Sequence, residues 1–321
     1  MPRDIWNNSS VVWFFAFIMT PLAQRQTVLQ RPLKNKNCPY CGCLFDGTVV
    51  VTKDHVVARR FVPKGKLHQS QNVILRACEP CNVTKSELED DVSALSMLPD
   101  LLGIFTHQDD AISDQAWRKA KDSYSRRTRR PISESGETLS ASGSPLPGLT
   151  MTATFVSPPQ ADEARVFELA RLQVAGFFFA LTYNFEQQLG GFWLGRFYPV
   201  MFSLRADWGN SVHHWFMNCV RAWQSRVIGP LADGFYKIAI RRHPSEALWS
   251  WALEWNRNIR VIGFFGNDQA LAPLLAAMPE LEVHSIGRSP DGAEMRLREE
   301  TPLAEDEDEL FNNPDLPDPA A

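Results

Sequence analysis

Two Cys-x-x-Cys motifs limit how this chain can fold more than any other feature of its sequence. Cys38 and Cys41 form the first motif, and Cys78 and Cys81 form the second. Four thiolates match the ligand number and softness of a closed tetrahedral zinc site. Because so small a unit has little core of its own, we expect metal binding and folding to be coupled. Cys43 lies close to the first motif, and a ligand set that uses it in place of Cys41 stays open at this stage.

The residues between the two motifs predict a ββα arrangement. Residues 48–52 (TVVVT) are β-branched throughout and residues 73–75 (VIL) are apolar, so both favour strands that pair as a hairpin. The polar and basic connection 58–71 is expected to be an exposed loop. Residues 84–98 favour a helix, with acidic residues in its early turns and Pro99 at its end.

Asp54, His55, Asn72 and Asn82 also lie within this frame, although a structural zinc needs none of them. An Asp-His pair after a strand, an Asn before the next strand and a helix that opens with Cys-Asn-x-x-Lys resemble the HNH endonuclease family. That family has a ββα-metal fold and hydrolyses phosphodiester bonds. The chain departs from the family pattern in having Ala58 where a proline often follows, and Asn82 rather than His at the last position.

The resemblance implies a role for each residue. His55 would be the general base, since the unperturbed pKa of histidine lies near neutrality. Asp54 and Asn82 would hold a catalytic Mg²⁺ or Mn²⁺ through oxygen atoms. Asn72 would hold the loop and orient the His55 ring. Adjacent strand residues point to opposite faces, so Asp54 and His55 serve one site only if the chain leaves the strand there.

Basic residues predict contacts with DNA. Lys85 lies one turn after Asn82 on the same helical face, where it could reach a phosphate, and Arg59 and Arg60 lie in the basic loop. The net charge is only −4, but residues 118–130 form a dense basic run with aromatic residues beside it. Such local positive fields attract phosphates. A solvated helix end and linker explains this run equally well.

The rest of the chain predicts a larger second domain. Apolar residues favour helices over 161–188, 211–228 and 270–278 and a strand over 281–286. Trp249, Trp251 and Trp255 share one face at period two, which favours a strand, although Pro244-Ser-Glu could start a helix through them. Core packing explains these tryptophans better than base stacking. The expected divisions are an apolar segment (1–30), the HNH domain with its zinc knuckles (31–100), a basic helix and flexible linker (101–160), an α+β domain (161–290) and an acidic disordered tail (291–321).

The apolar run Val11–Met19 does not predict a membrane span, because nine residues are too few. Arg3 is offset by Asp4, which disfavours a signal peptide. Paired thiolates suit a reducing compartment, so a cytoplasmic location is expected.

Together these features predict an α+β protein in which a small zinc-stabilised ββα-metal domain is joined to a larger, helix-rich domain. The expected function is metal-dependent cleavage of DNA, with no membrane partner. If the second domain forms a homodimer, two active sites could face opposite strands. The alternatives are a zinc-knuckle module that binds nucleic acid without cutting it, and a protein-interaction adaptor.

Overall fold

The computed structural model describes residues 32–68, 72–99, 109–136, 138–146, 148–156, 159–288 and 294–312. Strands β1 (Val51–His55) and β2 (Ile74–Cys78) form an antiparallel hairpin, and helix α2 (Glu79–Met97) follows directly. The order is therefore ββα, as the sequence predicts. The first strand starts later than expected and includes His55, because its ladder extends from the Val51–Cys78 pair to the His55–Ile74 pair.

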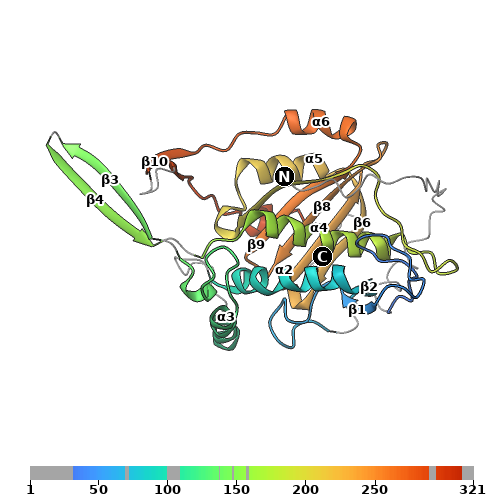
Figure 1. Cartoon of the computed structure of the whole chain (residues 1–321). Coiled ribbons are helices and arrows are strands. Elements are labelled where there is room, and N and C mark those ends of the chain that lie inside the picture. The colour runs from blue at the N-terminus through green and yellow to red at the C-terminus, as the bar shows by residue number, and fades with distance from the viewer. Residues whose placement is uncertain are drawn as a thin grey trace.

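The segment expected to be a basic helix and flexible linker is more ordered than predicted. It contains helix α3 (Asp110–Asp122) and a hairpin of β3 (Thr138–Leu146) and β4 (Leu149–Val156), which projects from the body of the protein (Figure 1). Residues 150–156 alternate threonine with mostly apolar residues. This period of two is typical of a strand, and the structure follows it rather than the high Ser, Gly and Pro content that favoured a linker.

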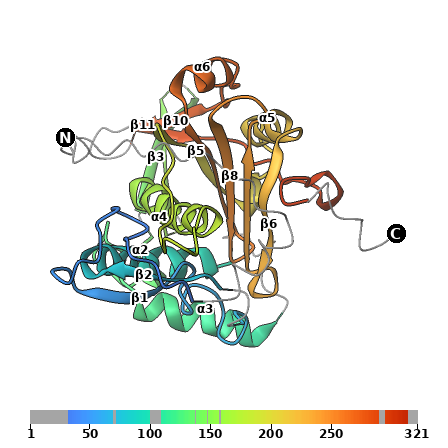
Figure 2. The same cartoon turned by 90° about the vertical axis from the view of Figure 1, so that its right-hand side faces the viewer.

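A five-stranded antiparallel sheet forms the centre of the larger part, in the order β5-β9-β8-β7-β6. Helix α4 (Glu163–Leu181) packs between one face of this sheet and α2, whereas α5 (Ser211–Val220) and α6 (Asp268–Ala276) pack on the other side (Figures 1 and 2). The second domain is thus centred on a sheet rather than rich in helices. The remaining elements are β5 (Arg196–Leu204), β6 (Gln224–Leu231), β7 (Tyr236–Arg242), β8 (Leu248–Trp255), β9 (Ile259–Gly266), β10 (His284–Arg288), β11 (Glu294–Leu297) and the short 3-10 helices η2 (Ile132–Glu134), η3 (Arg205–Asp207), η4 (Ala232–Gly234) and η5 (Glu305–Glu307).

The period of two in the tryptophan segment is that of strand β8. Trp251 and Trp255 are buried in the core on the α4 side, so they are core aromatics, as predicted. The helix expected over 211–228 is wrong beyond Val220, because residues 224–231 pair with β7 as an edge strand. The strand forms a hairpin with β7, which begins at Tyr236, so the helix ends before this pairing starts.

The ββα unit and the sheet share one hydrophobic core. Phe61, from the connection between β1 and β2, packs edge-on against Trp255 with ring centroids 5.4 Å apart. Asn256 Nδ2 donates to the Phe61 carbonyl oxygen at 2.9 Å. The prediction of an exposed 58–71 loop is therefore wrong near its start, where Phe61 and Val62 are buried.

The acidic tail is also ordered over much of its length, contrary to expectation. Asp308 pairs with the buried Arg260, and Leu310 is buried beneath the α5 side of the sheet. Arg241 Nη2 donates to the Leu310 carbonyl oxygen at 2.9 Å. The partners of the tail lie far from it in the sequence. Its acidic composition therefore wrongly predicted that the tail is disordered. The apolar segment 1–30 and residues 313–321 lie outside the described residues.

No helix in the described part of the chain is both long enough and apolar enough to span a bilayer.

Candidate metal centre and catalytic pocket

The four predicted thiolates come together in one cluster. The sulfur atoms of Cys38, Cys41, Cys78 and Cys81 all lie within 4.8 Å of one another, and those of Cys41 and Cys78 are 3.6 Å apart. The first motif forms a tight knuckle in which the Gly42 amide donates to the Cys38 carbonyl oxygen at 3.0 Å. Gly42 has a φ of +78°, which disfavours any other residue there.

The second motif spans the end of β2 and the first turn of α2, so a bound metal would join the knuckle to the junction of hairpin and helix. This arrangement selects Cys41 rather than Cys43 as the fourth ligand. The cluster could hold a metal such as zinc, for which four sulfur ligands are a common structural set.

The thiols differ in how readily they lose a proton. The pKa of Cys38 is lowered to about 5, chiefly by its hydrogen bond with Cys81. The same hydrogen bond raises the pKa of Cys81, and burial raises the pKa values of Cys78 and Cys43. The thiolate form is therefore favoured at Cys38, and binding a metal through the sulfurs of Cys78 and Cys81 would release their protons.

Asp54 faces α2 and belongs to a buried ionic network. Tyr40 donates its hydroxyl to Asp54 Oδ2, and Lys85 Nζ lies 3.3 Å from Asp54 Oδ1. Lys85 Nζ also donates to Glu89 Oε1 at 2.7 Å and to the His55 carbonyl oxygen at 2.8 Å. Although burial favours the neutral amine, Glu89 and Asp54 raise the pKa of Lys85. The ammonium therefore stays charged between two carboxylates.

This network changes the expected roles of two residues. The Lys85 side chain is 1% exposed and its three protons have acceptors, so the prediction that it contacts a phosphate is wrong for this arrangement. Both Asp54 oxygens accept hydrogen bonds, and Lys85 offsets the carboxylate charge. Asn82 lies on the same side of the hairpin, where its Nδ2 donates to Thr52 Oγ1 at 2.9 Å. Asp54 and Asn82 therefore do not form an open site that fits Mg²⁺ or Mn²⁺.

His55 lies on the opposite face of the hairpin, because β1 includes both residues. It lines a pocket with five other residues: Arg59, Leu67, His68, Asn72 and Ile74. His55 Nε2 is buried and has no hydrogen-bond partner among the described residues. Burial is the main cause that lowers the pKa of His55, and the positive charges of Arg59 and Lys53 add to it. The ring is thus held in the neutral form that accepts a proton.

Asn72 holds the chain that follows His55. Its Nδ2 donates to the Val57 carbonyl oxygen at 2.7 Å, and its Oδ1 accepts from the Val57 amide at 3.4 Å. Asn72 closes the loop as predicted, but these two bonds go to the backbone rather than to the His55 ring. Arg59 and Arg60 are exposed on the same loop.

Sequence reasoning missed two residues of this region. His68 lines the His55 pocket, and its Nε2 lies 3.5 Å from Asp233 Oδ1. Its position in a long polar loop carries no spacing signal. Tyr40 lies between the first two cysteines, where no pattern indicates a bond to Asp54. In contrast, the i, i+4 spacing of Lys85 and Glu89 could have indicated their ion pair.

Comparison with models of known protein families, with curated proteins and with solved structures finds no match for this chain.

Proposed function

We propose that this protein is a nuclease that hydrolyses DNA phosphodiester bonds and that His55 is its general base. The observation that carries this proposal is the His55 pocket. Its lining includes His55, whose pKa is lowered and whose Nε2 has no hydrogen-bond partner among the described residues, and the cationic side chain of Arg59. Hydrolysis of a phosphodiester needs both a base for the attacking water and positive charge near the phosphate.

Each residue of the pocket has a part in this reaction. The His55 imidazole accepts the proton of the attacking water, and Arg59 binds the phosphate oxygens and offsets their charge. Asn72 fixes the backbone after His55 and so keeps the ring in place. Zinc at the four thiolates would stabilise the ββα unit and take no part in the chemistry.

A catalytic Mg²⁺ or Mn²⁺, when bound at a nuclease site, neutralises charge on the phosphate and the leaving oxygen. Asp54 and Asn82 do not fit that role in the arrangement described above. We therefore assign no step to a cation held by these residues.

The experiment is plasmid cleavage by His55→Ala beside His214→Ala, a matched change at an exposed histidine on α5. We expect His55→Ala to retain its zinc and its affinity for DNA and to cut about 10²–10⁴-fold more slowly than the wild type. His214→Ala should cut normally. Cleavage by His55→Ala at the wild-type rate would show that the pocket is not the active site.

A module that binds nucleic acid without cutting it is the second candidate. The pairing of Asp54 with Lys85 favours it, because this pairing removes a carboxylate that the nuclease resemblance requires. The same assay distinguishes the two: retardation of DNA without cleavage by the pure wild-type protein selects the binding module.

A further inference from the structure

A compact turn, Ser125–Arg130, presents four arginines to solvent directly after α3. The Ser125 amide donates to the Arg130 carbonyl oxygen at 2.9 Å, and the Arg129 amide donates to the Ser125 carbonyl oxygen at 2.8 Å. The Ser125 side chain is buried and accepts from the Thr128 amide at 3.3 Å. This backbone is therefore fixed from inside the turn, whereas Arg126, Arg127, Arg129 and Arg130 are exposed.

One residue of the turn has a strained backbone. Arg129 has a φ of +57°, in the left-handed region that non-glycine residues seldom adopt. Such strain persists where the surrounding contacts determine the conformation, and it gathers at functional sites.

Basic residues outnumber acidic ones in the segment that carries the turn. Residues 117–131 contain seven basic residues and a single acidic one, Asp122. Two aromatic side chains are exposed among them: Trp117 is 47% exposed and Tyr124 is 56% exposed. Arginines with exposed aromatic rings suit a nucleic-acid strand, whose phosphates bind the guanidinium groups while its sugars and bases pack on the rings.

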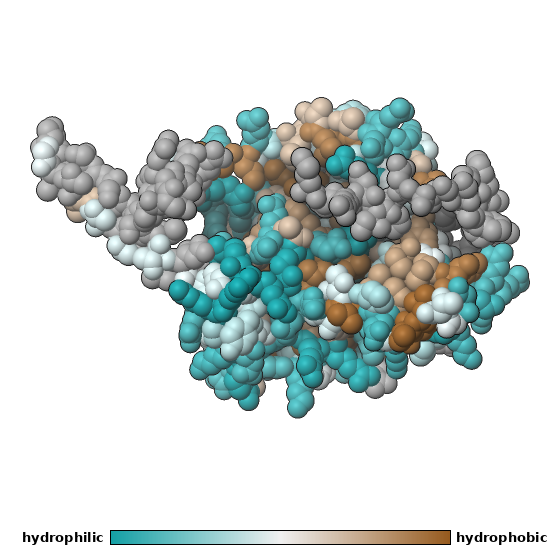
Figure 3. All heavy atoms as spheres, in the orientation of Figure 1, coloured by the Kyte–Doolittle hydropathy of each residue, from teal (hydrophilic) through white to brown (hydrophobic). Residues whose placement is uncertain are grey.

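The turn is structurally continuous with the His55 pocket through α3. Lys119, on α3, donates to the Arg60 carbonyl oxygen, and the Lys64 amide donates to Gln115 Oε1 on α3 at 3.1 Å. Arg60 follows Arg59, which lines the pocket. The exposed cations Arg60, Lys64, Arg118 and Lys121 lie on this connection. The face seen in Figure 3 is mostly hydrophilic in the region of α3.

We propose that the Ser125–Arg130 turn is a clamp for the phosphate backbone of DNA and that it holds the strand whose scissile phosphate lies against the mouth of the His55 pocket. The second clause rests on the proposed nuclease function. The first does not, since the clamp would bind DNA whether or not the pocket cuts it.

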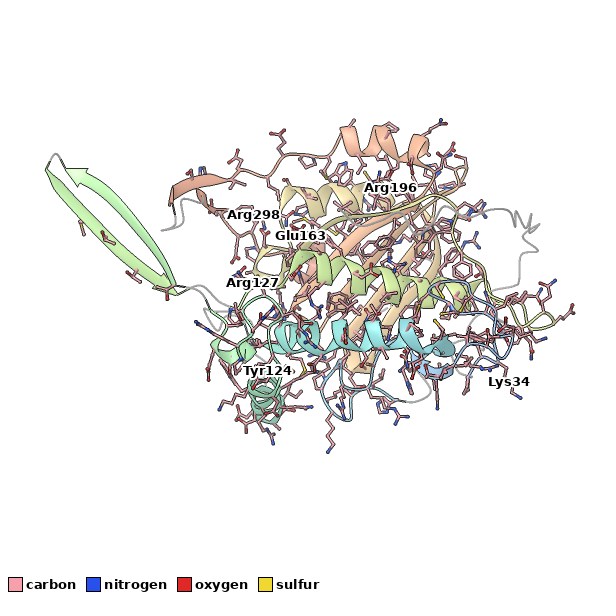
Figure 4. The ribbon with its side chains drawn as sticks, viewed as in Figure 1. Lys34, Tyr124, Arg127, Glu163, Arg196 and Arg298 are labelled. Atoms are coloured by element: carbon pink, nitrogen blue, oxygen red, sulfur yellow. The ribbon has the colours of Figure 1, made fainter. Side chains whose placement is uncertain are left out.

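The test compares Arg126→Gln/Arg130→Gln with Lys34→Gln/Lys36→Gln. Both variants remove two exposed positive charges, and Figure 4 shows Lys34 at the opposite end of the molecule from Arg127. Fluorescence anisotropy would measure the affinity for duplex and single-stranded DNA at several salt concentrations. Zinc content and melting temperature would verify that both variants fold.

If each arginine contacts one phosphate of a duplex, the slope of log affinity against log salt should fall in magnitude by about 1.8. We expect the arginine variant to bind duplex DNA at least about tenfold more weakly at low salt, and the lysine variant to bind as the wild type does. An unchanged slope and affinity in the arginine variant would overturn the clamp. Failure of the wild type to bind any DNA, with binding instead to anionic phosphatidylserine vesicles, would also overturn it.

The same measurements separate the clamp from the nuclease. If the wild type cuts DNA but the arginine variant binds DNA as tightly as the wild type, the clamp is rejected and the nuclease is retained. If the arginine variant binds DNA more weakly but the wild type cuts no DNA, the nuclease is rejected and the clamp is retained. If both hold, the arginine variant should cut more slowly at limiting protein and regain its rate when protein saturates the DNA.

Discussion

Lys85 shows how a residue with an apparent surface role can belong to the interior. It is placed between Asp54 and Glu89 with its side chain 1% exposed, and it also binds the His55 carbonyl oxygen. It therefore joins α2 to the end of β1, beside the pocket. Removal of one partner from such a buried ion pair leaves charge that neither water nor protein compensates.

We therefore predict that Lys85→Met lowers the free energy of unfolding by about 3–5 kcal/mol, the usual cost when one partner of a buried ion pair is removed. Urea denaturation measures this change. Lys53→Met, an exposed lysine on β1, is the matched control and should change stability by less than about 0.5 kcal/mol. A Lys85 variant as stable as this control would mean that the two carboxylates are neutral in the folded protein.

The proposed role of His55 predicts how the rate of cleavage should depend on pH. Burial and the charges of Arg59 and Lys53 lower its pKa below the usual 6.5. The neutral form is the base, so the rate should rise with pH and reach its plateau at a lower pH than an ordinary histidine would give. Single-turnover rates between about pH 4.5 and pH 8.5, about two units on each side of that value, measure this rise.

Lys53→Gln sharpens the pH test. Loss of this positive charge should raise the pKa of His55. The increase of the cleavage rate should therefore occur at higher pH, while the plateau rate stays the same. If the midpoint of the rise in rate lies above pH 6.5 in the wild type, or if Lys53→Gln does not shift this midpoint, then a group other than His55 controls the rate.

At the scale of elements, the contact between α4 and the chain after His55 depends on Gly176. A Cβ atom at this position would lie 2.7 Å from Val56 Cγ2, and Val56 is fully buried. We predict that Gly176→Ala destabilises the protein by about 1–3 kcal/mol, because overpacking outweighs the higher helix propensity of alanine. Thermal denaturation measures the change.

The paired variant Val56→Ala/Gly176→Ala provides the control for this contact. The smaller side chain makes room for the added methyl group, so the pair should be more stable than the sum of the two single changes predicts. If the stability changes of the two single variants add up to that of the pair, Gly176 and Val56 are not in close contact.

The sequence predicts well those elements whose pattern is carried by residues close together in the chain. The Cys-x-x-Cys motifs and the strand-like runs lie close together in the chain, so the ββα order could be predicted. The tryptophans of β8 also carry their own period. The faces of β1 were harder to predict, because only the extent of its ladder shows that Asp54 and His55 point apart.

Features that depend on distant residues could not be predicted. Phe61 looks like part of a polar loop until Trp255 is placed beside it. Asp308 looks like part of a disordered acidic tail until Arg260 pairs with it. In both cases the partner comes from the sheet, and no sequence period connects the two residues.

At the scale of the whole molecule, α4 and the ββα unit together cover one face of the central sheet. On one face, Gln173 Oε1 of α4 accepts hydrogen bonds from the Tyr236 hydroxyl and from Trp255 Nε1, both at 3.0 Å. Phe61 packs on the same two rings. The ββα unit therefore covers part of the core of the sheet and is not a separate domain connected only by a linker.

This shared core predicts that loss of the metal destabilises the entire protein. A structural zinc contributes about 10–16 kcal/mol in small zinc domains, which is comparable with the whole stability of a typical protein. Cys78→Ser should therefore lose its zinc and unfold the ββα unit, which exposes Phe61 and the rings beneath it. Cys43→Ser, at a thiol outside the cluster, should retain both zinc and stability.

Tryptophan fluorescence and far-ultraviolet circular dichroism during heating measure the outcome. Residues 32–99 contain no tryptophan, whereas Trp251 and Trp255 are buried in the sheet and Trp255 packs against Phe61. Fluorescence therefore reports on the sheet and on its contact with the ββα unit. We expect one transition in the wild type, with the same midpoint by both methods, and a lower midpoint by both in Cys78→Ser. A Cys78→Ser protein that loses zinc while the fluorescence midpoint stays at the wild-type temperature would show that the sheet folds independently of the metal centre.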